Sequence, residues 1–479
     1  MLKEHYPLSI PGHSGAGAKK ISVRGPYDGE AIATLDLADR DAAFTALNGA
    51  RELFADRKNH LPVYERAAIL RRLSALIEKH AEDLAVLIAR EGGKPLADAK
   101  IEVTRAANTV LLCAEEAVRS HGEEIPMGGS AAGFGRLAFT TPEPVGVVLA
   151  ISAFNHPVNL IAHQVGPAVA AGCPVLIKPA LETALSCLAF MELLKDAGLP
   201  EGWATAIPCE NDVAGELVKN DGIAFLNFIG SARVGWMLRS QVAPGVRCAL
   251  EHGGAAPAIF DDGADIDRFL PLLMKGGYYH AGQVCVSVQR IFVHQNMHEA
   301  LRAKLIAAAE VLRTGDPTDA KTEVGPLIRA GEAARVHGMV EDATAKGADL
   351  LIGGKTLDNQ CYAPTVLDNV GDECRVMKEE IFGPVLAVTP FTTLDEAIDR
   401  ANAVPWSFQA SIMTPSVDAA LRAAKNLDAA AVMVNDHTAF RVDWMPFAGH
   451  KQSGLSTGGV RYAIDDMMRK KLVVLRGPS

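Results

Sequence analysis

An alternation of short apolar runs with longer helical segments, which begins near Val145, limits the possible folds of this chain more than any other pattern. Val145–Ala153 is a continuous apolar run with the length of a buried strand, and Leu160–Ala171 after it has helical spacing. Such an alternation predicts a parallel sheet with helices on both faces, the usual dinucleotide scaffold. The later members are Pro174–Lys178, Leu181–Ala197, Ala204–Pro208, Val213–Asn220 and Ile223–Phe228.

A second alternating region runs from about Glu251 to Asn435, so the fold class is α/β throughout. A chain of 479 residues is too long for one compact core. Two helices, over Leu61 to about Arg90 and over Asp98–Ser120, precede the first region. Apparent strands of the second region are Arg290–His294, Val385–Pro390 and Val432–Asn435, and its helices are Met297–Arg313, Ala330–Lys346, Thr393–Asn402 and Val417–Leu427.

Charge, hydropathy and cysteine usage exclude several classes of protein. The formal net charge of −10 disfavours nucleic acid or an anionic membrane as the main partner. The longest apolar stretches, Val145–Ala153 and Val165–Ile177, are too short or too broken by Gly and Pro to span a bilayer. The eight cysteines form no Cys-x-x-Cys pair, which indicates reduced thiols and a cytoplasmic location.

Three segments carry side chains suited to acyl chemistry. Cys285 ends a Gly-Gln-Val-Cys stretch, Glu251 opens Glu-His-Gly-Gly, and Asn155 stands in Phe-Asn-His-Pro. They supply a nucleophile, a base that takes a proton from water, and a donor to a developing oxyanion. Each also has an ordinary structural reading. The cysteine is then a small buried hydrophobe, the carboxylate a helix cap or ion-pair partner, and the asparagine an Asx turn.

A metal site is the weakest of the chemical hypotheses. Cys248 and His252 are four residues apart. Two ligands do not make a structural zinc site, and residues four apart in or near a strand lie too far apart to share one ion easily. We therefore expect no metal.

Seven segments, taken in order, resemble the NAD(P)-dependent aldehyde dehydrogenase superfamily nearly from end to end. Each is weak alone, whereas seven in the family order are highly specific. They are Phe154-Asn155-His156-Pro157; Lys178-Pro179-Ala180; Phe228-Ile229-Gly230-Ser231 with Val234-Gly235; Glu251-His252-Gly253-Gly254; Gly282-Gln283-Val284-Cys285; Glu380-Ile381-Phe382-Gly383-Pro384; and Pro446-Phe447-Ala448-Gly449-His450-Lys451-Gln452-Ser453-Gly454.

The resemblance implies oxidation of an aldehyde to a carboxylic acid. Cys285 would attack the aldehyde carbonyl, and the Asn155 amide with the Cys285 backbone N–H would hold the resulting oxyanion. Hydride would leave to the nicotinamide, and Glu251 would activate the water that hydrolyses the thioester. Hydride can depart only from such a tetrahedral adduct, because a free aldehyde has no good leaving group.

NAD or NADP is the implied cofactor, with NAD slightly favoured. One departure weakens the case for strict NAD preference: Leu181 stands where the family often has a Glu that binds ribose hydroxyls and repels a 2′-phosphate. No Gly-x-Gly-x-x-Gly fingerprint is present, so the cofactor residues depend on the resemblance. They are Lys178 at the adenosine ribose, Gly230, Ser231 and Gly235 at the pyrophosphate, Gly253 beside the cofactor, and Glu380 and Phe382 at the nicotinamide ribose and ring.

The substrate is expected to be a small polar or anionic aldehyde. Asp436–Met445 resembles the family loop at the substrate entrance, and the local patterns are closest to the lactaldehyde, phosphonoacetaldehyde and semialdehyde branches. Arg441 on this loop, together with His156, would meet a polar or anionic tail. The alternative is that Arg441 pairs with Asp436 or Asp443.

Two other functions remain open from the sequence. A CoA-acylating relative would pass the thioester to a thiol, but those relatives generally lack the hydrolytic carboxylate that Glu251 supplies. A catalytically silent relative that serves as a binding protein is disfavoured by the intact Cys285, Glu251 and Asn155.

The resemblance also divides the chain into domains and implies self-association as a homodimer or homotetramer. The fold is expected to combine a Rossmann-like cofactor domain, an α/β catalytic domain and a β-hairpin oligomerisation element. The cofactor domain is placed at 1–120 and 142–250, the catalytic domain at 251–435, the oligomerisation elements at 121–141 and 466–479, and the entrance loop with its return at 436–465.

Overall fold

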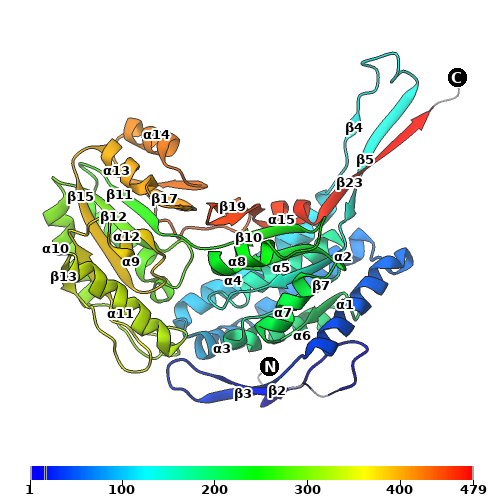
Figure 1. The fold of residues 1–479 in the computed structure, drawn as a ribbon, viewed down its shortest axis with the longest axis horizontal. Coiled ribbons are helices and arrows are strands. Elements are labelled where there is room, and N and C mark those ends of the chain that lie inside the picture. Colours follow the sequence, from blue (N-terminus) through cyan, green and yellow to red (C-terminus); the bar gives the residue numbers. More distant parts are fainter. Residues whose placement is uncertain (1–2, 16, 18, 477–479) are drawn as a thin grey trace.

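Two lobes and a projecting arm make up the protein in the computed structural model, which describes residues 3–15, 17 and 19–476 (Figure 1). Residues 1–2, 16 and 18 of the expected cofactor domain, and residues 477–479 of the expected oligomerisation element, lie outside this part. Each lobe is built around one large sheet. A small sheet near the N-terminus lies at the edge of the first lobe, with strands β1 (His5–Tyr6), β2 (Lys19–Arg24) and β3 (Ala31–Leu37).

The first lobe contains a six-stranded sheet in the order β21-β10-β9-β6-β7-β8, in which only β21 is antiparallel to its neighbour. The predicted alternation of strands and helices is confirmed. The strands are β6 (Val147–Ile151), β7 (Val175–Lys178), β8 (Ala204–Ala206), β9 (Ile223–Ile229), β10 (Arg247–Glu251) and β21 (Gly454–Leu455).

Helices cover both faces of this sheet, as the continuous apolar run of β6 requires. Val148 and Ala150 of β6 belong to one core, whereas Val147, Leu149 and Ile151 belong to a second core on the opposite face. Successive side chains of a strand point to opposite faces, so both must be apolar when both are covered. The helices are α1 (Arg40–Ala55), α2 (Val63–Lys79), α3 (Ala81–Gly92), α4 (Leu96–Arg119), α5 (Asn159–Ala171), α6 (Ala184–Asp196), α7 (Asn211–Val218) and α8 (Ala232–Arg239).

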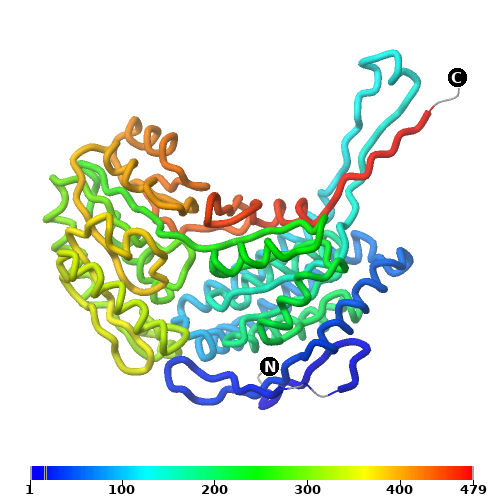
Figure 2. Tube along the Cα trace, in the orientation of Figure 1, coloured from blue at the N-terminus to red at the C-terminus, as the bar shows by residue number. Residues whose placement is uncertain are grey.

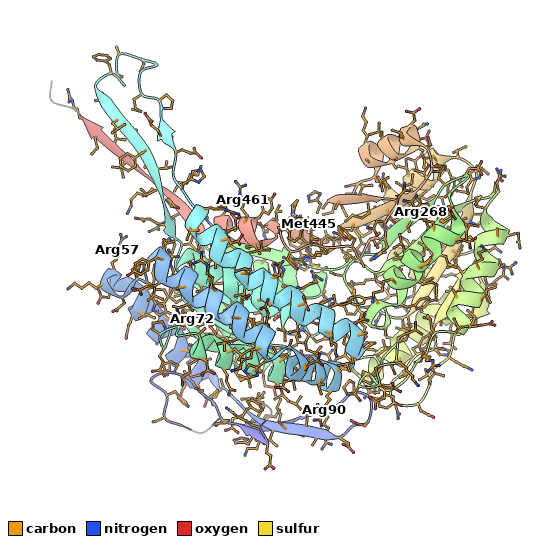
Figure 3. The ribbon with its side chains drawn as sticks, turned by 180° about the vertical axis from the view of Figure 1, so that it is seen from behind. Arg57, Arg72, Arg90, Arg268, Met445 and Arg461 are labelled. Atoms are coloured by element: carbon orange, nitrogen blue, oxygen red, sulfur yellow. The ribbon has the colours of Figure 1, made fainter. Side chains whose placement is uncertain are left out.

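The long helix expected over Leu61 to about Arg90 is in fact two helices. α2 ends at Lys79, and His80, with φ −105° and ψ 20°, separates it from α3. Apolar residues keep their helical spacing across this break, and for that reason the pattern hides it. The helix expected over Asp98–Ser120 is confirmed as α4, which runs beside α2 across the back of the lobe (Figure 3).

The second lobe contains a seven-stranded sheet in the order β13-β14-β15-β12-β11-β17-β18, parallel except for β13. All of its strands lie between residues 251 and 435, although the domain boundaries themselves stay a prediction. The strands are β11 (Ala256–Phe260), β12 (Val288–His294), β13 (Asp349–Ile352), β14 (Thr365–Asp368), β15 (Val385–Phe391), β17 (Gln409–Met413) and β18 (Ala431–Val434).

Helices and one core complete the second lobe. The chain then returns toward the first lobe through short strand pairs, and Met445 on this return lies between the lobes (Figure 3). The helices are α9 (Ile266–Tyr278), α10 (His298–Glu310), α11 (Ala330–Ala345), α12 (Arg375–Lys378), α13 (Leu394–Asn402) and α14 (Val417–Asn426). The short pairs are β16 (Trp406–Ser407) with β20 (His450–Lys451), and β19 (Phe447–Ala448) with β22 (Thr457–Gly458).

The arm consists of β4 (Glu124–Ile125), β5 (Arg136–Pro144) and the last strand β23 (Met468–Arg476), which follows helix α15 (Val460–Asp466). It projects away from the body, and the described C-terminal end lies near its tip (Figure 2). β23 pairs along its full length with β5 and is one of the two edge strands of this sheet.

Within residues 3–15, 17 and 19–476, no helix combines the length and the apolar content needed to cross a bilayer.

Candidate active site

The sheet of the first lobe places four predicted residues at one edge. The chain passes from β6 outward through β7 and β8 and returns to β9 on the other side of β6, so the strand order reverses between β6 and β9. Ligands of open α/β sheets bind at such a point, outside the carboxyl ends of the strands. Asn155 follows β6, Lys178 ends β7, Gly230 follows β9 and Glu251 ends β10.

Cys285 is presented from the second lobe by a tight turn that precedes β12. His280, Ala281 and Gly282 have φ of 48°, 54° and 71°, three successive left-handed residues. A Cβ at position 282 would lie 2.1 Å from the Gly383 carbonyl oxygen, so only glycine fits there.

Asn155 connects the two lobes. Its Nδ2 donates to the Gln283 carbonyl oxygen at 2.9 Å, two residues before Cys285. The Gln283 side chain anchors the same turn, because its Oε1 accepts from the Ile328 N–H at 3.0 Å. One N–H of the Asn155 amide therefore holds the cysteine turn, and within the described residues the other N–H has no hydrogen-bond partner.

A cavity of about 740 Å³ lies between the lobes, within the range of small-molecule and cofactor sites. It brings together eleven of the twelve predicted site residues from both lobes. They are Asn155, His156, Lys178, Gly230, Ser231, Glu251, Gly253, Cys285, Glu380, Phe382 and Arg441.

Gly235 is the predicted residue that does not line the cavity. It lies inside α8, where a Cβ would be 2.0 Å from His252 Nε2. Its small size therefore lets α8 approach the chain after β10. Gly235 shapes the cavity wall through this packing.

Burial disfavours ionisation of the Cys285 thiol. Burial raises its pKa to about 12, and the nearby carboxylates of Glu380 and Glu251 act in the same direction. The Arg441 guanidinium opposes them by favouring the thiolate. A reactive thiolate therefore needs help from its surroundings.

Glu251 has the environment of a base rather than of an ion-pair partner. Burial raises the pKa of its carboxyl group, and Arg441 opposes this shift. Its Oε1 lies so close to Gly458 that a Cβ there would be 2.3 Å away. A raised carboxyl pKa makes the ionised form a stronger proton acceptor.

Glu380 occupies space that only a glycine leaves open. A Cβ at Gly253 would lie 1.6 Å from Glu380 Oε1, an oxygen for which the described part of the chain provides no hydrogen-bond partner. Burial raises the pKa of Glu380 to about 7, although Arg335 and a backbone N–H of Gly254 lower it. A buried carboxylate oxygen without a partner fits ribose hydroxyls as donors.

The far part of the cavity fits an adenosine. Lys178 is buried, its Nζ makes one long contact of 3.4 Å with the Pro179 carbonyl oxygen among the described residues, and burial lowers its pKa. Leu181 also lines this part. Two carboxylates nearby already have ion-pair partners, because Glu182 pairs with Arg329 at 2.6 Å and Glu210 pairs with Lys19 at 2.7 Å.

Arg105 of α4 also lines the cavity, although it was not among the site residues predicted from the sequence. Two of its N–H groups donate to the two carboxylate oxygens of Asp443, at 2.8 and 3.1 Å. His163 also binds Asp443, at 2.8 Å. Burial raises the pKa of Asp443, but the hydrogen bonds of His163 and Arg105 and the charge of Arg105 outweigh it and hold the pKa well below its usual range.

Arg441 has no such carboxylate. Asp443 is engaged by Arg105, and among the described residues no Asp or Glu forms an ion pair with Arg441. Its guanidinium carbon lies 3.7 Å from the centre of the Phe447 ring, and its Nε finds no hydrogen-bond partner in the part of the chain that is described. The alternative pairing with Asp436 or Asp443 is therefore wrong.

The contact of Arg441 with His163 does not satisfy the guanidinium. The two nitrogens lie 3.4 Å apart. His163 Nε2 must carry a proton to donate to the Asp443 carboxylate, which can only accept, so the same nitrogen cannot accept from Arg441. Arg441 therefore keeps unused donors at the cavity.

His156 faces the cavity without a charge. Burial lowers its pKa well below the ordinary value, and the cations Lys94, Arg105 and Arg441 add to this effect. Its Nε2 lies 3.3 Å from the Tyr279 hydroxyl. A neutral imidazole in this place contributes a polar contact.

Across the part of the chain that the structure describes, no three His, Cys, Asp or Glu side chains are grouped to hold a metal ion.

Comparison with known proteins gives one family across the chain. The model of the aldehyde dehydrogenase family matches residues 13–473. The 3-sulfolactaldehyde dehydrogenase of Priestia aryabhattai is 38% identical over 98% of this chain and 98% of its own length. The crystal structure of aldehyde dehydrogenase 21 from Physcomitrella patens, with the reaction product succinate, is 34% identical and has a TM-score of 0.95 over 99% of this chain and 98% of that one.

A third relative was solved with a cofactor. The glyceraldehyde-3-phosphate dehydrogenase from Methanocaldococcus jannaschii, complexed with NADP, is 34% identical, with a TM-score of 0.91 over 95% of this chain and 99% of that one.

Proposed function

The chain belongs to the aldehyde dehydrogenase family and oxidises a small polar aldehyde with NAD or NADP, and we propose that Cys285, Glu251 and Asn155 carry out this reaction. One observation supports the assignment above all. A thiol from the second lobe, a carboxylate from the carboxyl end of β10 and an amide that crosses between the lobes line one cavity.

Cys285 attacks the aldehyde carbon after its thiol has released a proton to solvent. The new C–S bond turns the carbonyl into a tetrahedral oxyanion. The free N–H of Asn155 and the Cys285 backbone N–H donate to this oxygen. Such donors act mainly on the transition state, because the charge they bind develops only there.

The residues of the cavity fit NAD or NADP, as the unpartnered Glu380 oxygen and the buried Lys178 indicate. When bound, the cofactor supplies the hydride acceptor that converts the tetrahedral adduct into a thioester. Lys178 and Glu380 bind the two riboses in this proposal, Gly230 and Ser231 lie at the pyrophosphate, and Phe382 packs at the nicotinamide.

Glu251 completes the reaction by taking a proton from water. The oxygen attacks the thioester carbonyl, the C–S bond breaks, and the thiolate of Cys285 leaves with the carboxylic acid as product. Burial suits Glu251 to this task, since its raised pKa makes the carboxylate a better proton acceptor than one in water.

The substrate in this proposal is an aldehyde with one anionic tail, a carboxylate or a sulfonate. Among the described residues Arg441 forms no ion pair and keeps unused N–H donors, whereas the charge of Arg105 is already paired with Asp443. A planar guanidinium suits bidentate recognition of such oxyanions. His156 contributes a polar contact beside it.

Steady-state kinetics of Arg441→Ala test the substrate class. Loss of a charged hydrogen-bonded contact of about 1.5–3 kcal/mol raises KM roughly 10- to 100-fold for an acidic aldehyde, but not for a neutral aldehyde of equal length. Arg268→Ala is the matched control, because Arg268 also stacks on a phenylalanine, Phe269, but lies outside the cavity on α9 (Figure 3). Equal increases in KM for both aldehydes would refute the assignment of Arg441.

The CoA-acylating alternative is disfavoured by Glu251, which lies in the cavity with Cys285. Product analysis with and without CoA tests it. The free acid should form at the same rate in both, and a CoA thioester as the main product would overturn hydrolysis by Glu251.

We also propose a homodimer or homotetramer that forms through the arm, in a cytoplasmic location. Four large apolar side chains of β5 and β23 are about half exposed: Leu137, Leu472, Val474 and Leu475. β23 has a free edge, which is a ready template for another chain. All eight cysteines are free thiols, as a reducing compartment allows. Light scattering tests the assembly, since a monomer at micromolar concentration would contradict it.

A further inference from the structure

Arg441 acts on the two reacting groups, Cys285 and Glu251, as well as on a substrate tail. We propose that the Arg441 guanidinium is the positive charge that stabilises the Cys285 thiolate and the Glu251 carboxylate in the free enzyme. When an anionic substrate tail binds to Arg441, it neutralises this charge and removes the stabilisation. The inference rests on the proposed function, because it takes the anionic tail to Arg441. It adds a coupling between recognition of the tail and the ionisation of Cys285 and Glu251.

Arg441 and Cys285 pack against the same small apolar cluster. Its guanidinium stacks on Phe447, with 3.7 Å from the guanidinium carbon to the ring centre. Phe447 belongs to a small apolar cluster with Val284 and Val286, and Cys285 packs against the same cluster. The cation is thus held on one side of a rigid aromatic ring whose cluster carries the reactive cysteine.

Among the described residues, the charges with the largest effect on the Cys285 sulfur are those of Arg441, Glu380 and Glu251, and Arg441 carries the positive one. Glu380 and Glu251 disfavour a thiolate, whereas Arg441 favours it. Glu251 has Arg441 as its charged neighbour of opposite sign. Removing the positive charge therefore leaves a thiolate beside two carboxylates in a partly desolvated cavity, where repulsion is strong.

The charges around Arg441 leave it free for this task. Glu251, Cys285 and Asp443 favour its charged form, and Arg105 opposes it. Asp443 is engaged by Arg105 and His163 at distances of 2.8 Å. His163 and His156 are neutral near pH 7, since burial lowers the pKa of each. Among the described residues, no carboxylate forms an ion pair with the guanidinium. It can therefore act on Cys285, on Glu251 and on an incoming anion.

The coupling predicts a sequence of events, in which ionisation of Cys285 precedes binding of the anionic tail. In the free enzyme, Arg441 helps Cys285 to ionise. Once the tail neutralises Arg441, the thiolate is less stabilised and more nucleophilic, and Glu251 becomes a stronger base for the later attack of water. The pH profile of kcat/KM reports the free enzyme and that of kcat the complex. With an acidic aldehyde, kcat should therefore show the higher apparent pKa, whereas with a neutral aldehyde the two profiles should agree.

Alkylation of Cys285 by iodoacetamide, a neutral reagent, tests the charge effect directly. Arg441→Met keeps the length and the apolar packing on Phe447 and removes the charge. It should raise the apparent pKa of alkylation by about one pH unit, a roughly tenfold slower reaction below that pKa. Arg441→Lys keeps the charge and should restore most of the shift. An unchanged pKa in Arg441→Met would overturn the proposal.

The native enzyme provides a test that needs no variant. Methanesulfonate mimics the tail alone, and methanesulfonamide is its neutral match. Methanesulfonate should raise the apparent pKa of alkylation in the native enzyme and leave it unchanged in Arg441→Met, while methanesulfonamide changes neither. Steric protection would lower the maximal rate at high pH without moving the pKa, and this result would overturn the proposal.

Failure of this inference is distinguishable from failure of the proposed substrate class. A selective rise in KM for acidic aldehydes in Arg441→Met, with no change in the alkylation pKa, leaves Arg441 as a binding residue and rejects the coupling. A shifted alkylation pKa with no selectivity in KM supports the charge effect in the free enzyme and rejects the anionic tail.

Discussion

Replacing Asn155 with alanine removes two interactions of one side-chain amide: a structural hydrogen bond in the resting protein and a contact with the oxyanion during the reaction. In the resting protein its Nδ2 donates to the Gln283 carbonyl oxygen at 2.9 Å, in a buried place between the lobes. Loss of this bond leaves one carbonyl unpaired and lowers the free energy of unfolding by about 1–2 kcal/mol. In the reaction the second N–H meets the oxyanion. Loss of one such donor costs about 2.7–4 kcal/mol of barrier, on the order of 10²–10³ in rate.

Single-turnover formation of reduced nicotinamide measures the chemical step directly, since it does not depend on thioester hydrolysis or product release. Urea unfolding of the same variant measures stability. Ser74→Ala is the matched control, because Ser74 Oγ also donates to a buried carbonyl, that of Ala107 at 2.8 Å, but neither residue lines the cavity. It should lose similar stability and keep its rate. A fall of less than tenfold in Asn155→Ala, or an equal fall in Ser74→Ala, would refute the oxyanion role.

Three further predictions concern the cofactor and the salt-bridge network. In Gly253→Ala the new Cβ would lie 1.6 Å from Glu380 Oε1, so Glu380 must move and cofactor affinity should fall at least tenfold in a fluorescence titration. An unchanged Kd would contradict this role. Leu181→Glu should weaken NADP binding relative to NAD by about tenfold or more, through repulsion of the 2′-phosphate, and a constant ratio would count against it. Asp443, whose pKa is depressed in the folded protein, should contribute stability that is present above the ordinary Asp pKa of about 4 and is lost as pH falls below it. Urea unfolding from pH 3 to 7 should show a shallower acid loss in Asp443→Asn, and equal slopes would argue against the network.

Much of the fold could be predicted because the patterns are local. The buried run at Val145–Ala153 became β6, and the alternation after it gave the sheet of the first lobe. The family, the α/β fold, the reaction class and the NAD or NADP cofactor are confirmed. The single helix expected across His80 was wrong, because the apolar spacing carries through the break. The helix expected over Leu181–Ala197 begins later, since a 3₁₀ turn precedes α6.

The charge arrangement of the site could not be predicted from the sequence. Arg105 lies on α4, far from the motifs along the chain, and no local pattern relates it to Asp443. Sequence alone left Arg441 with either an aspartate or a substrate as partner. Only the folded structure shows that Arg105 engages Asp443 and leaves Arg441 unpaired. The residue roles themselves stay predictions.

The central claim is a covalent thioester at Cys285 that Glu251 hydrolyses. Glu251→Gln keeps the size of the side chain and removes the base, so the enzyme should take up aldehyde, release one equivalent of reduced nicotinamide and then stall. Mass spectrometry of the stalled protein should show the acyl mass on the peptide that contains Cys285. Turnover at the native rate with no adduct, or an adduct on a different residue, would contradict the account.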